Sequence, residues 1–417
     1  MPGFSRDVSG RACLAGAPVD ALVDAAGVGT PAYVYDLDAI EAEAREMIGA
    51  LGQGPHLVAY AVKANSAGSI VRTVAAAGTG AEVVSGGELE VALGAGVPPD
   101  RILASSVAKL DGEIDRAIAA GIRALQMESV EEIERVAARA RSLGKIARIA
   151  LRLNPGVTVD THAHVATGHD GAKFGIALAD LPHAYDIADS QENLTLVGVG
   201  AHVGSTLRDV ESYLTSARVV CGVARARLAA GKALEYVDFG GGFGVDYGAG
   251  PVPRPAELVR AARRLLDQEG LGALGLVVEP GRSMVAAHGV LVAGVVQGKR
   301  APDRSWVFLD AAMNDLIRPA LYGAAHRIEP TDRLPSGPVV RVAGPVCESA
   351  DDFGEHVLSE PLPLRVVIRD AGAYGFTMAS EYNGRALPAE IFARGGSVAS
   401  ASPSPGRAAW VAGRLRA

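Results

Sequence analysis

The sequence predicts an α/β protein in which a closed (β/α)8 barrel of the TIM type is joined to a separate β domain. Three observations lead to this prediction. Short apolar runs alternate with amphipathic helical stretches from about residue 58 to about residue 282. After about residue 284 the pattern changes to β-type runs joined by turns. The chain has 417 residues, 49% of them hydrophobic, which is long enough for two domains.

Eight apolar runs in the first region have the length and composition of strands that are buried on both faces. They are Leu57–Ala64, Ala81–Ser85, Ile102–Ser105, Ala124–Met127, Ile146–Leu153, Leu196–His202, Tyr236–Phe239 and Leu276–Val278. Eight such strands fit a closed barrel. An open doubly wound sheet is the alternative, but it needs a glycine fingerprint after its first strand. The first run ends instead in Lys63-Ala64-Asn65-Ser66.

The stretches between these runs carry helix signals. Ser129 followed by Glu132 predicts a capping box, and Gly144 predicts the end of that helix. Asp111 precedes a helical stretch that Gly121 ends, and the segment from Pro255 to Gly270 has the same character. Helices between parallel strands are what a barrel requires.

The second region predicts a β-sandwich or Greek-key barrel. Its β-type runs are Gly289–Val296, Trp306–Leu309, Val339–Ala343 and Leu364–Ile368. Thr30–Tyr35, which lies ahead of the barrel, is expected to add an N-terminal strand to this domain. We therefore place the barrel at residues 37–283 and the β domain at residues 1–36 and 284–417. The tail from Arg394 is rich in small residues and proline, which predicts loose order at its end.

Composition excludes several classes of partner. Charged residues make up 21% of the chain and the net charge is −7, so neither nucleic acid nor an acidic membrane surface is expected. No apolar run is long enough to span a membrane, and no signal peptide is apparent.

The three cysteines, Cys13, Cys221 and Cys347, are far apart, which indicates neither a disulfide framework nor a metal site. A cytoplasmic location is expected.

The C-terminal ends of the predicted strands carry reactive side chains, and in a barrel these ends form the active face. In chain order they are Lys63, Ser85, Asn154, His202, the run Gly240-Gly241-Gly242, and Glu279 with Arg282. A lysine amine, a histidine, a glycine turn and a carboxylate are therefore expected at one mouth.

Each of these residues has a structural and a functional interpretation. Lys63, one of only six lysines, is either a rim lysine in a salt bridge or a Schiff-base lysine. The glycines form either a tight turn or a phosphate cradle, which barrels often place after strands seven and eight. Glu279 and Arg282 either pair with each other or bind a cofactor ring nitrogen and a substrate carboxylate. His202 is either a structural histidine or a ring stacked on a planar cofactor.

Three polar motifs follow strands of the predicted β domain. They lie at residues 314–322, 344–349 and 370–375, and they contain groups too polar for an ordinary β core. Rim loops are the alternative interpretation of each.

Together, these motifs resemble the diaminopimelate and ornithine decarboxylase family of fold-type III pyridoxal enzymes, from about Ala32 to about Ile391. The most specific stretches are Tyr60–Asn65, Val83–Glu88, Thr161–Phe174, His202–Ser205, Asp238–Tyr247, Glu279–Arg282, Asp310–Tyr322, Gly344–Ser349 and Asp370–Glu390. Met313–Tyr322 is most similar to the diaminopimelate branch. The resemblance therefore implies decarboxylation of meso-2,6-diaminopimelate at its D-centre, giving L-lysine and CO2 in lysine biosynthesis.

The resemblance also implies roles for individual residues. Lys63 would bind pyridoxal 5'-phosphate as a Schiff base, Glu279 would pair with the pyridinium nitrogen, and His202 would stack on the ring. The phosphate would be held by Ser205, Gly240, Gly241, Gly242, Gly281, Arg282 and Tyr374. The substrate would be bound by Arg282, Arg318, Tyr322, Glu348 and Tyr374. Cys347 would donate the proton after CO2 leaves, entering with Glu348 from the second subunit of a homodimer.

Three positions depart from the family pattern. Ala201 replaces a cysteine or histidine, Ala104–Ala108 replaces a stretch rich in asparagine and glycine, and Gly323 replaces a polar residue. They leave open a decarboxylase of a related carboxylated amine, such as carboxynorspermidine, a siderophore precursor or a carrier-bound amino acid. A non-catalytic homologue would lack Cys347 or the arginines. A racemase of related fold would set an arginine, not Glu279, against the ring nitrogen.

Overall fold

The computed structural model describes residues 3–156, 173–202 and 204–416. The chain divides into two compact units. The barrel unit comprises Glu43–Gly244 and Val252–Ser283, and the β unit comprises Met1–Ala42, Val245–Pro251 and Met284–Ala417. Of the stretches that carry the family resemblance, residues 161–172 and Val203 lie outside the described residues.

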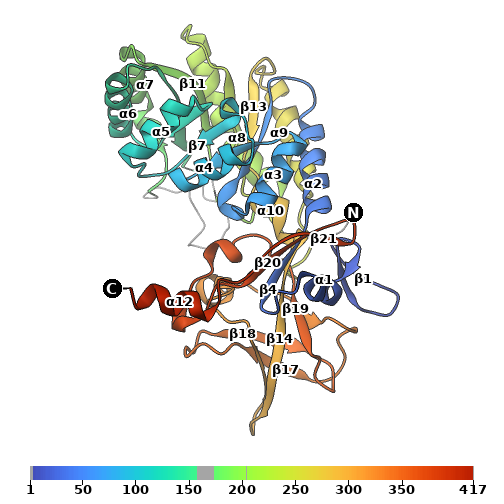
Figure 1. The fold of residues 1–417 in the computed structure, drawn as a ribbon. Coiled ribbons are helices and arrows are strands. Elements are labelled where there is room, and N and C mark those ends of the chain that lie inside the picture. The colour runs from blue at the N-terminus through green and yellow to red at the C-terminus, as the bar shows by residue number, and fades with distance from the viewer. Residues whose placement is uncertain (1–2, 157–172, 203, 417) are drawn as a thin grey trace. The chain divides into compact units, whose positions relative to one another are not determined.

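Eight parallel strands within the described residues close into a barrel (Figure 1). They are β5 (Leu57–Ala61), β6 (Gly80–Val83), β7 (Ile102–Ala104), β8 (Ala124–Met127), β9 (Ala147–Asn154), β11 (Leu194–Ala201), β12 (Tyr236–Asp238) and β13 (Gly275–Val278). Closure comes from the pairings of β13 with β5 and of β8 with β9. The two-residue strand β10 (Ile176–Ala177) pairs only with β9. The predicted barrel is thus confirmed, and the open-sheet alternative is wrong.

Side chains from the strands pack together in one buried cluster. Its members are Leu57, Ala59, Leu103, Ala124, Ala150, Val197, Tyr236 and Val277. Tyr236 is by far the largest, and a Cβ atom on Gly198 of β11 would lie 2.6 Å from its ring. Glycine is therefore required at position 198 because the tyrosine ring occupies that space.

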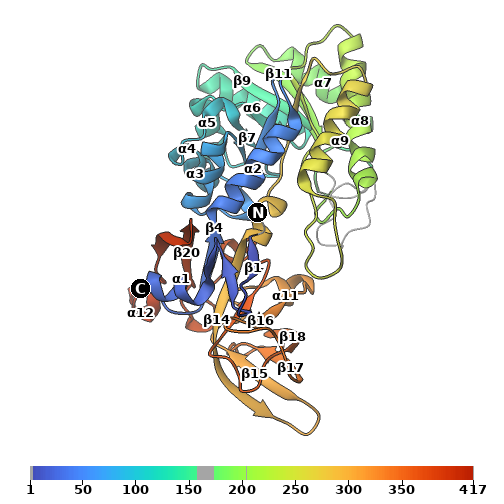
Figure 2. The same ribbon diagram turned by 90° about the vertical axis from the view of Figure 1, so that its right-hand side faces the viewer.

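Helices alternate with the strands and surround them (Figures 1 and 2). They are α3 (Gly68–Ala77), α4 (Gly86–Gly94), α5 (Asp111–Ala120), α6 (Val130–Ser142), α7 (Leu181–Ser190), α8 (Val210–Ala229) and α9 (Pro255–Gln268), and α2 (Leu37–Leu51) precedes them in the chain. Gly121, which was predicted to end α5, adopts a left-handed φ of 68°. Among the described residues, none of the helices has the length and apolar character needed to cross a membrane.

The capping box predicted at α6 forms only in part. The Ser129 hydroxyl accepts a hydrogen bond from the Glu132 amide at 3.2 Å, as expected for an N-cap. The Glu132 carboxylate, however, accepts from the Glu128 amide at 2.9 Å and pairs with Lys109 at 3.0 Å. The buried ammonium holds this carboxylate, so the reciprocal bond to Ser129 predicted from the sequence is wrong.

Lys109 is a buried cation that ties three parts of the barrel together. Its side chain is 3% exposed, and burial lowers its pKa. Besides Glu132 on α6, the ammonium donates to the carbonyls of Ser106, after β7, and Gln126, on β8. A buried ammonium is stable only when it is paired and hydrogen-bonded, so the loss of any one of these partners would destabilise the fold around it.

The β unit is built on one long strand, β14 (Gly289–Arg300). Its first half pairs with β4 (Ala32–Asp36) on one side and β19 (Arg365–Ile368) on the other, and its second half pairs with β15 (Ser305–Leu309). The register shifts between Val295 and Gln297, where the strand passes from one group of partners to the other. The expectation that residues near the N-terminus add a strand to this domain is confirmed by β4 (Figures 1 and 2).

Further short elements complete the β unit. The strands are β1 (Phe4–Arg6), β2 (Ala12–Leu14), β3 (Ala17–Pro18), β16 (Ile328–Pro330), β17 (Val339–Ala343), β18 (Asp352–Val357), β20 (Ala389–Arg394) and β21 (Ser397–Ser402), and the helices are α1 (Val19–Ala26), α10 (Arg282–Val285), which begins in the barrel unit, α11 (Arg318–Tyr322) and α12 (Gly406–Arg414). The loose order predicted for the tail is wrong, because β21 pairs with β20 and α12 follows it. The backbone makes that pairing, so a composition of small side chains did not signal it.

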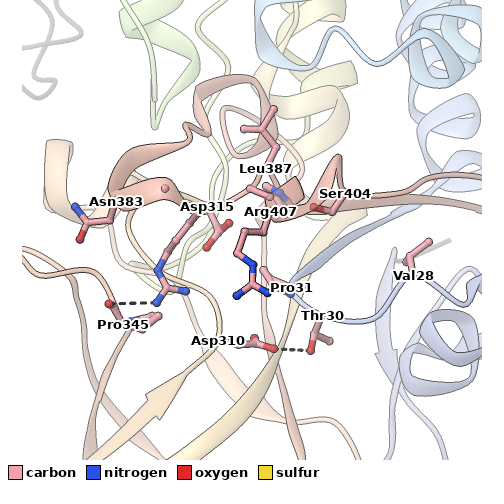
Figure 3. A pocket seen from close by; sticks show the side chains of 14 residues that line it. Val28, Thr30, Pro31, Asp310, Asp315, Pro345, Asn383, Leu387, Ser404 and Arg407 are labelled. Carbon is pink, nitrogen blue, oxygen red and sulfur yellow. Dashed lines mark hydrogen bonds between the residues drawn. The ribbon is translucent and has the colours of Figure 1, made fainter. Parts of the chain in front are cut away.

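Asp315 is a buried carboxylate in the β unit. Its side chain accepts hydrogen bonds from the Ala312 amide at 2.8 Å and from the Asn314 side chain at 3.2 Å. Burial raises its pKa from the ordinary 3.8 to about 7. Figure 3 shows it on the wall of a cavity of about 600 Å³, where Asp310 accepts a hydrogen bond from Thr30.

We expect Lys109→Ala to lower the free energy of unfolding of the barrel unit by about 3–5 kcal/mol, because it leaves the Glu132 carboxylate buried and unpaired. The matched control is Arg116→Ala, which breaks the exposed pair with Glu90 and should lower the free energy of unfolding far less, because water screens an exposed ion pair. Urea unfolding followed by far-UV circular dichroism measures both. Equal losses for the two variants would contradict a special role of the buried cation.

We expect Asp315→Asn to change how stability depends on pH. Between pH 3.8 and about 7 the native carboxyl keeps a proton that the unfolded chain loses, so the native state of the wild type loses stability as pH rises through this range. The amide variant does not titrate. From pH 5 to pH 8 its free energy of unfolding should therefore gain about 3 kcal/mol relative to the wild type. A difference between the two proteins that stays constant with pH would refute the assignment.

Candidate active site

Lys63 follows β5 in a single 3-10 turn, Val62–Ala64. Its Nζ lies 2.6 Å from Oε2 of Glu82, a carboxylate on β6 that is almost fully buried. The lysine side chain itself is 34% exposed. The salt bridge of the structural interpretation is thus present, and the amine is still accessible for chemistry.

A cavity of about 360 Å³ opens at the C-terminal ends of the barrel strands. It is lined by Lys63, Glu82, Val84, Ser105, Ser106, Val107, Gln126, Arg152, Phe174, His202 and Glu279. Three side chains that the sequence analysis singled out, Lys63, His202 and Glu279, therefore share one cavity. They come from three different strand ends, and barrel closure brings them together.

Two other strand-end residues have local roles. The Ser85 hydroxyl accepts from the Glu88 amide at 3.2 Å and so caps α4. The Asn154 side chain accepts from the Gly156 amide at 3.1 Å, which stabilises the turn after β9. Neither residue lines the cavity.

Glu279 is the charged member of a buried acidic pair. Gln126 Nε2 donates to Glu279 Oε1 at 2.9 Å and to Asp238 Oδ2 at 3.0 Å. Burial raises the pKa of Glu279, but His202 and the cationic Lys63 outweigh it and hold the pKa below its ordinary value. Burial and the charge of Glu279 both raise the pKa of Asp238. At neutral pH the negative charge therefore resides on Glu279.

His202 is oriented by the backbone of the glycine run. The Gly241 amide donates to His202 Nδ1 at 3.2 Å, which orients the imidazole ring. Nδ1 is 3.7 Å from Glu279 Oε2, which is a close approach but too long for a hydrogen bond. The side chain is 21% exposed and lines the cavity.

Backbone packing requires glycine throughout the Gly240–Gly242 turn. Gly240 and Gly242 have φ values of 67° and 87°, in the left-handed region. A Cβ atom on Gly241 would lie 2.0 Å from the carbonyl oxygen of Glu279, and one on Gly242 would lie 2.1 Å from that of Gly204. The tight turn of the structural interpretation is therefore real, and it draws the segments around residues 204 and 279 together.

Donor groups gather beside this turn. The Arg282 guanidinium donates to the Ser205 hydroxyl through Nε at 3.2 Å and through Nη2 at 3.1 Å. The Leu207 amide donates to the Gly242 carbonyl at 2.9 Å. Between Ser205 and Leu207, Thr206 has a φ of 68°, a strained conformation for a β-branched residue. A positive charge, a hydroxyl and a glycine turn at one place suit an anionic group such as a phosphate.

Gly281 joins the phosphate-like site to the lysine segment. A Cβ atom there would lie 2.9 Å from the Ala61 side chain and 3.0 Å from that of Ala64. The carbonyl of Pro280 accepts from the Ala61 amide at 3.0 Å. The loop after β13 therefore packs directly against the turn that carries Lys63.

Sequence reasoning missed three polar residues that line the cavity, Glu82, Gln126 and Arg152. Glu82 and Gln126 are each the only polar side chain within a short apolar strand, β6 and β8 respectively. A polar group in such a run is costly unless it has a partner. A polar side chain inside an apolar run was therefore a signal for Glu82 and Gln126, but the sequence prediction considered only residues at the ends of the strands.

Of the five predicted substrate residues, Arg282 lies in the barrel unit, and the other four, Arg318, Tyr322, Glu348 and Tyr374, lie in the β unit. Arg318, on α11, is 4% exposed, lies 2.7 Å from His326 Nε2 and sits 4.5 Å above the Tyr247 ring. Tyr322 ends the same helix. Tyr374 has a φ of 55°, a conformation that a bulky residue rarely adopts and that accompanies functional sites. The neighbours of Arg318 were not singled out from the sequence.

Cys347 and Glu348 lie in the loop between β17 and β18, and both are exposed. Cys13 and Cys221 are buried. This matches the distinction drawn from the sequence, which singled out Cys347 because it stands in a polar motif.

Comparisons with known proteins agree on one family. Residues 37–286 match the family described as pyridoxal-dependent decarboxylase, pyridoxal binding domain. Diaminopimelate decarboxylase of Zymomonas mobilis is 40% identical over 393 residues, which cover 93% of this chain and 92% of that protein. The structure of diaminopimelate decarboxylase from M. jannaschii with L-lysine has a TM-score of 0.91 at 33% identity and covers 99% of this chain and 98% of that chain. The Helicobacter pylori enzyme, also with L-lysine, has a TM-score of 0.85 at 33% identity, covering 93% and 97%.

The family description implies a pyridoxal cofactor, and the residues of the barrel unit fit one. Lys63 offers an amine for the aldehyde, and Glu279 offers an ionised carboxylate for the ring nitrogen. Ser205, Arg282 and the glycine turn, which admits no side chain, offer donors for the phosphate. The geometry and the comparisons agree, and the chain belongs to the diaminopimelate decarboxylase family of pyridoxal-dependent decarboxylases.

Proposed function

We propose that this chain is a carboxy-lyase that uses pyridoxal 5'-phosphate to remove CO2 from the D-centre of meso-2,6-diaminopimelate and release L-lysine. The observation that carries the proposal is the cavity shared by Lys63 and Glu279 at the active face of the barrel. The relatives named diaminopimelate decarboxylase support the choice of substrate, as do the related structures solved with L-lysine.

The residues of the cavity match the needs of this reaction. When bound, the cofactor supplies an electron-poor ring that takes up the electron pair left by departing CO2. Glu279 keeps a negative charge at neutral pH and so holds a proton on the ring nitrogen. Lys63 provides the amine for covalent attachment, and its partner Glu82 orients that amine. His202, oriented by the Gly241 amide, would flank the cofactor ring.

The phosphate is assigned to the donors beside the glycine turn. The Ser205 hydroxyl and the backbone of the 240–242 turn bind it, together with the backbone of Gly281 and Arg282. Tyr374 contributes its hydroxyl. The proximity of Arg282 to Ser205 supports the part of this assignment that lies in the barrel unit.

Recognition of the substrate rests on its second amino-acid end. Diaminopimelate keeps a carboxylate and an amine there, whereas ornithine has only an amine. The guanidinium groups of Arg282 and Arg318 and the hydroxyl of Tyr322 bind this carboxylate, and Glu348 binds the amine, with Tyr374 close to the same end. A guanidinium left unpaired by a substrate without the carboxylate disfavours that substrate.

Cys347 donates the proton to the carbon that loses CO2, because a thiol can deliver a proton if it stands near the reacting atom. We assign Cys347 and Glu348 to the partner subunit of a homodimer with shared active sites. The protein acts in the cytoplasm, where its three cysteines stay reduced.

A second candidate is a decarboxylase of a related carboxylated amine such as carboxynorspermidine. One observation favours it: Ser105, Ser106 and Val107, which depart from the family pattern, line the cavity. A wall of different chemistry can change which substrate fits best.

The test is CO2 release from meso-diaminopimelate, ornithine, arginine, lysine and carboxynorspermidine, with mass spectrometry of the products. We expect release from meso-diaminopimelate alone and a product with the mass of lysine. Lys63→Ala should abolish both turnover and the visible absorbance of the bound cofactor, because no amine remains for attachment. A product of unchanged mass and altered stereochemistry would mean a racemase, and a protein that takes up no cofactor would defeat the proposal.

Cys347→Ala should lower kcat by about 10²-fold or more while cofactor absorbance is retained, because only the proton donor is removed. Mixing this variant with Lys63→Ala should restore part of the activity if one subunit supplies the lysine and the other the thiol. Steady-state kinetics of each variant and of the mixture measure this. Turnover of Cys347→Ala near that of the wild type would assign the proton to another group, and a mixture without activity would count against shared sites.

A further inference from the structure

One short segment of the β unit holds the loop that carries Cys347 and Glu348. The Tyr382 hydroxyl donates to Glu348 Oε1. The Cys347 amide donates to Asn383 Oδ1 at 3.1 Å. Two residues further on, Arg385 donates to the carbonyl of Pro345 at 3.3 Å, the contact drawn as a dashed line ending at Pro345 in Figure 3.

The other side of the same loop is held by Asp351. Its carboxylate accepts from the Val346 amide and from the Met313 amide, both at 2.7 Å, and its own amide donates to the Glu348 carbonyl at 3.1 Å. The backbone from position 345 to 348 is thus fixed from two sides, while the side chains of Cys347 and Glu348 are exposed.

The contacts from Tyr382 and Asn383 contribute little to the stability of the fold. Glu348 and Cys347 are exposed, and Tyr382 is 46% exposed, so water competes for every one of these hydrogen bonds. Their effect is instead to restrict where the two exposed side chains can lie.

The backbone of Asn383 supports the same conclusion. Its φ is 57°, in the left-handed region, which glycine adopts most easily and asparagine tolerates. The next residue, Gly384, is also left-handed, with a φ of 70°. Position 383 nevertheless carries asparagine rather than glycine, and the side-chain oxygen of Asn383 accepts a hydrogen bond from the Cys347 amide.

We propose that Tyr382 and Asn383 are positioning residues, Asn383 for the thiol of Cys347 and Tyr382 for the carboxylate of Glu348. This rests on the proposed function, in which Cys347 delivers the proton and Glu348 binds the distal amine. The two contacts then serve different steps. Asn383 governs kcat through the proton donor, and Tyr382 governs KM through the amine contact.

Four variants test this proposal. Tyr382→Phe removes only the hydroxyl, and Asn383→Gly keeps the left-handed backbone but removes the acceptor. Asn383→Asp keeps both the acceptor and tolerance of this conformation. Tyr185→Phe is the matched control, because its hydroxyl, on α7 of the barrel unit, has no hydrogen-bond partner within the described residues.

In steady-state kinetics with meso-diaminopimelate, we expect Tyr382→Phe to raise KM about fivefold with kcat within about twofold of wild type. Asn383→Gly should lower kcat about tenfold with little change in KM, and Asn383→Asp should restore kcat to within about twofold. Tyr185→Phe should match the wild type. Wild-type constants for both Tyr382→Phe and Asn383→Gly would overturn the proposal, as would equal losses in Asn383→Gly and Asn383→Asp.

A second readout does not depend on turnover. Cys13 and Cys221 are buried and Cys347 is exposed in the single chain, so a small chromogenic thiol reagent that enters the shared active site of the holoenzyme reports on Cys347. We expect its rate of reaction to rise about threefold or more in Asn383→Gly, because the loop loosens, and to stay at the wild-type value in Asn383→Asp and Tyr185→Phe. An unchanged rate in Asn383→Gly would overturn the role of Asn383.

The kinetic constants and the thiol reaction rates together distinguish a failure of the proposed function from a failure of the positioning role. If the wild type fails to release CO2 from meso-diaminopimelate, the proposed function fails, and the thiol rates still decide whether Asn383 positions Cys347. If the wild type is active but neither the constants nor the thiol rates respond, the proposed function stands and the positioning role is wrong. Should Asn383→Gly lose its far-UV circular dichroism, Asn383→Ala replaces it as the variant without the acceptor, and Tyr382→Phe, which keeps the backbone unchanged, decides the role of Tyr382.

Discussion

The structure of the site depends on the closure of the barrel sheet. The pairings of β13 with β5 and of β8 with β9 turn a row of strands into a ring. Because all strands are parallel, their C-terminal ends meet at one face. Lys63 and Glu279, which are far apart in the sequence, line one cavity for this reason alone. The packing of Gly281 against Ala61 and Ala64 shows how closely the first and last strand ends are joined.

The second constraint is electrostatic. Two acids, Asp238 and Glu279, lie buried on neighbouring strand ends and share the amide of Gln126. Two charges there would repel each other in a region of low dielectric, so only one carboxyl is ionised. His202 and the cationic Lys63 both lower the pKa of Glu279, so the negative charge stays on that carboxyl. The charge is therefore directed into the cavity.

The eight strands were predictable because strands buried on both faces leave continuous apolar runs, and the chain shows each of them at the expected place. The three chemical groups of the cavity were predictable because they stand where those runs end. What could not be predicted depends on partners that folding supplies. Glu82 contacts Lys63 only because β6 pairs with β5 in the folded sheet. The Glu132 carboxylate pairs with Lys109 instead of completing the capping box. The tail forms the strand β21 because its backbone pairs with that of β20.

The glycine turn after β12 also bears on how such a pocket can diverge. Every side chain at positions 241 and 242 would collide with a neighbouring carbonyl, so mutation has no room to act there. Ser105, Ser106 and Val107 form the opposite case, since they already carry side chains that line the cavity. New substrate preferences would therefore be expected to arise by change at this permissive wall, while the rigid turn is inherited intact.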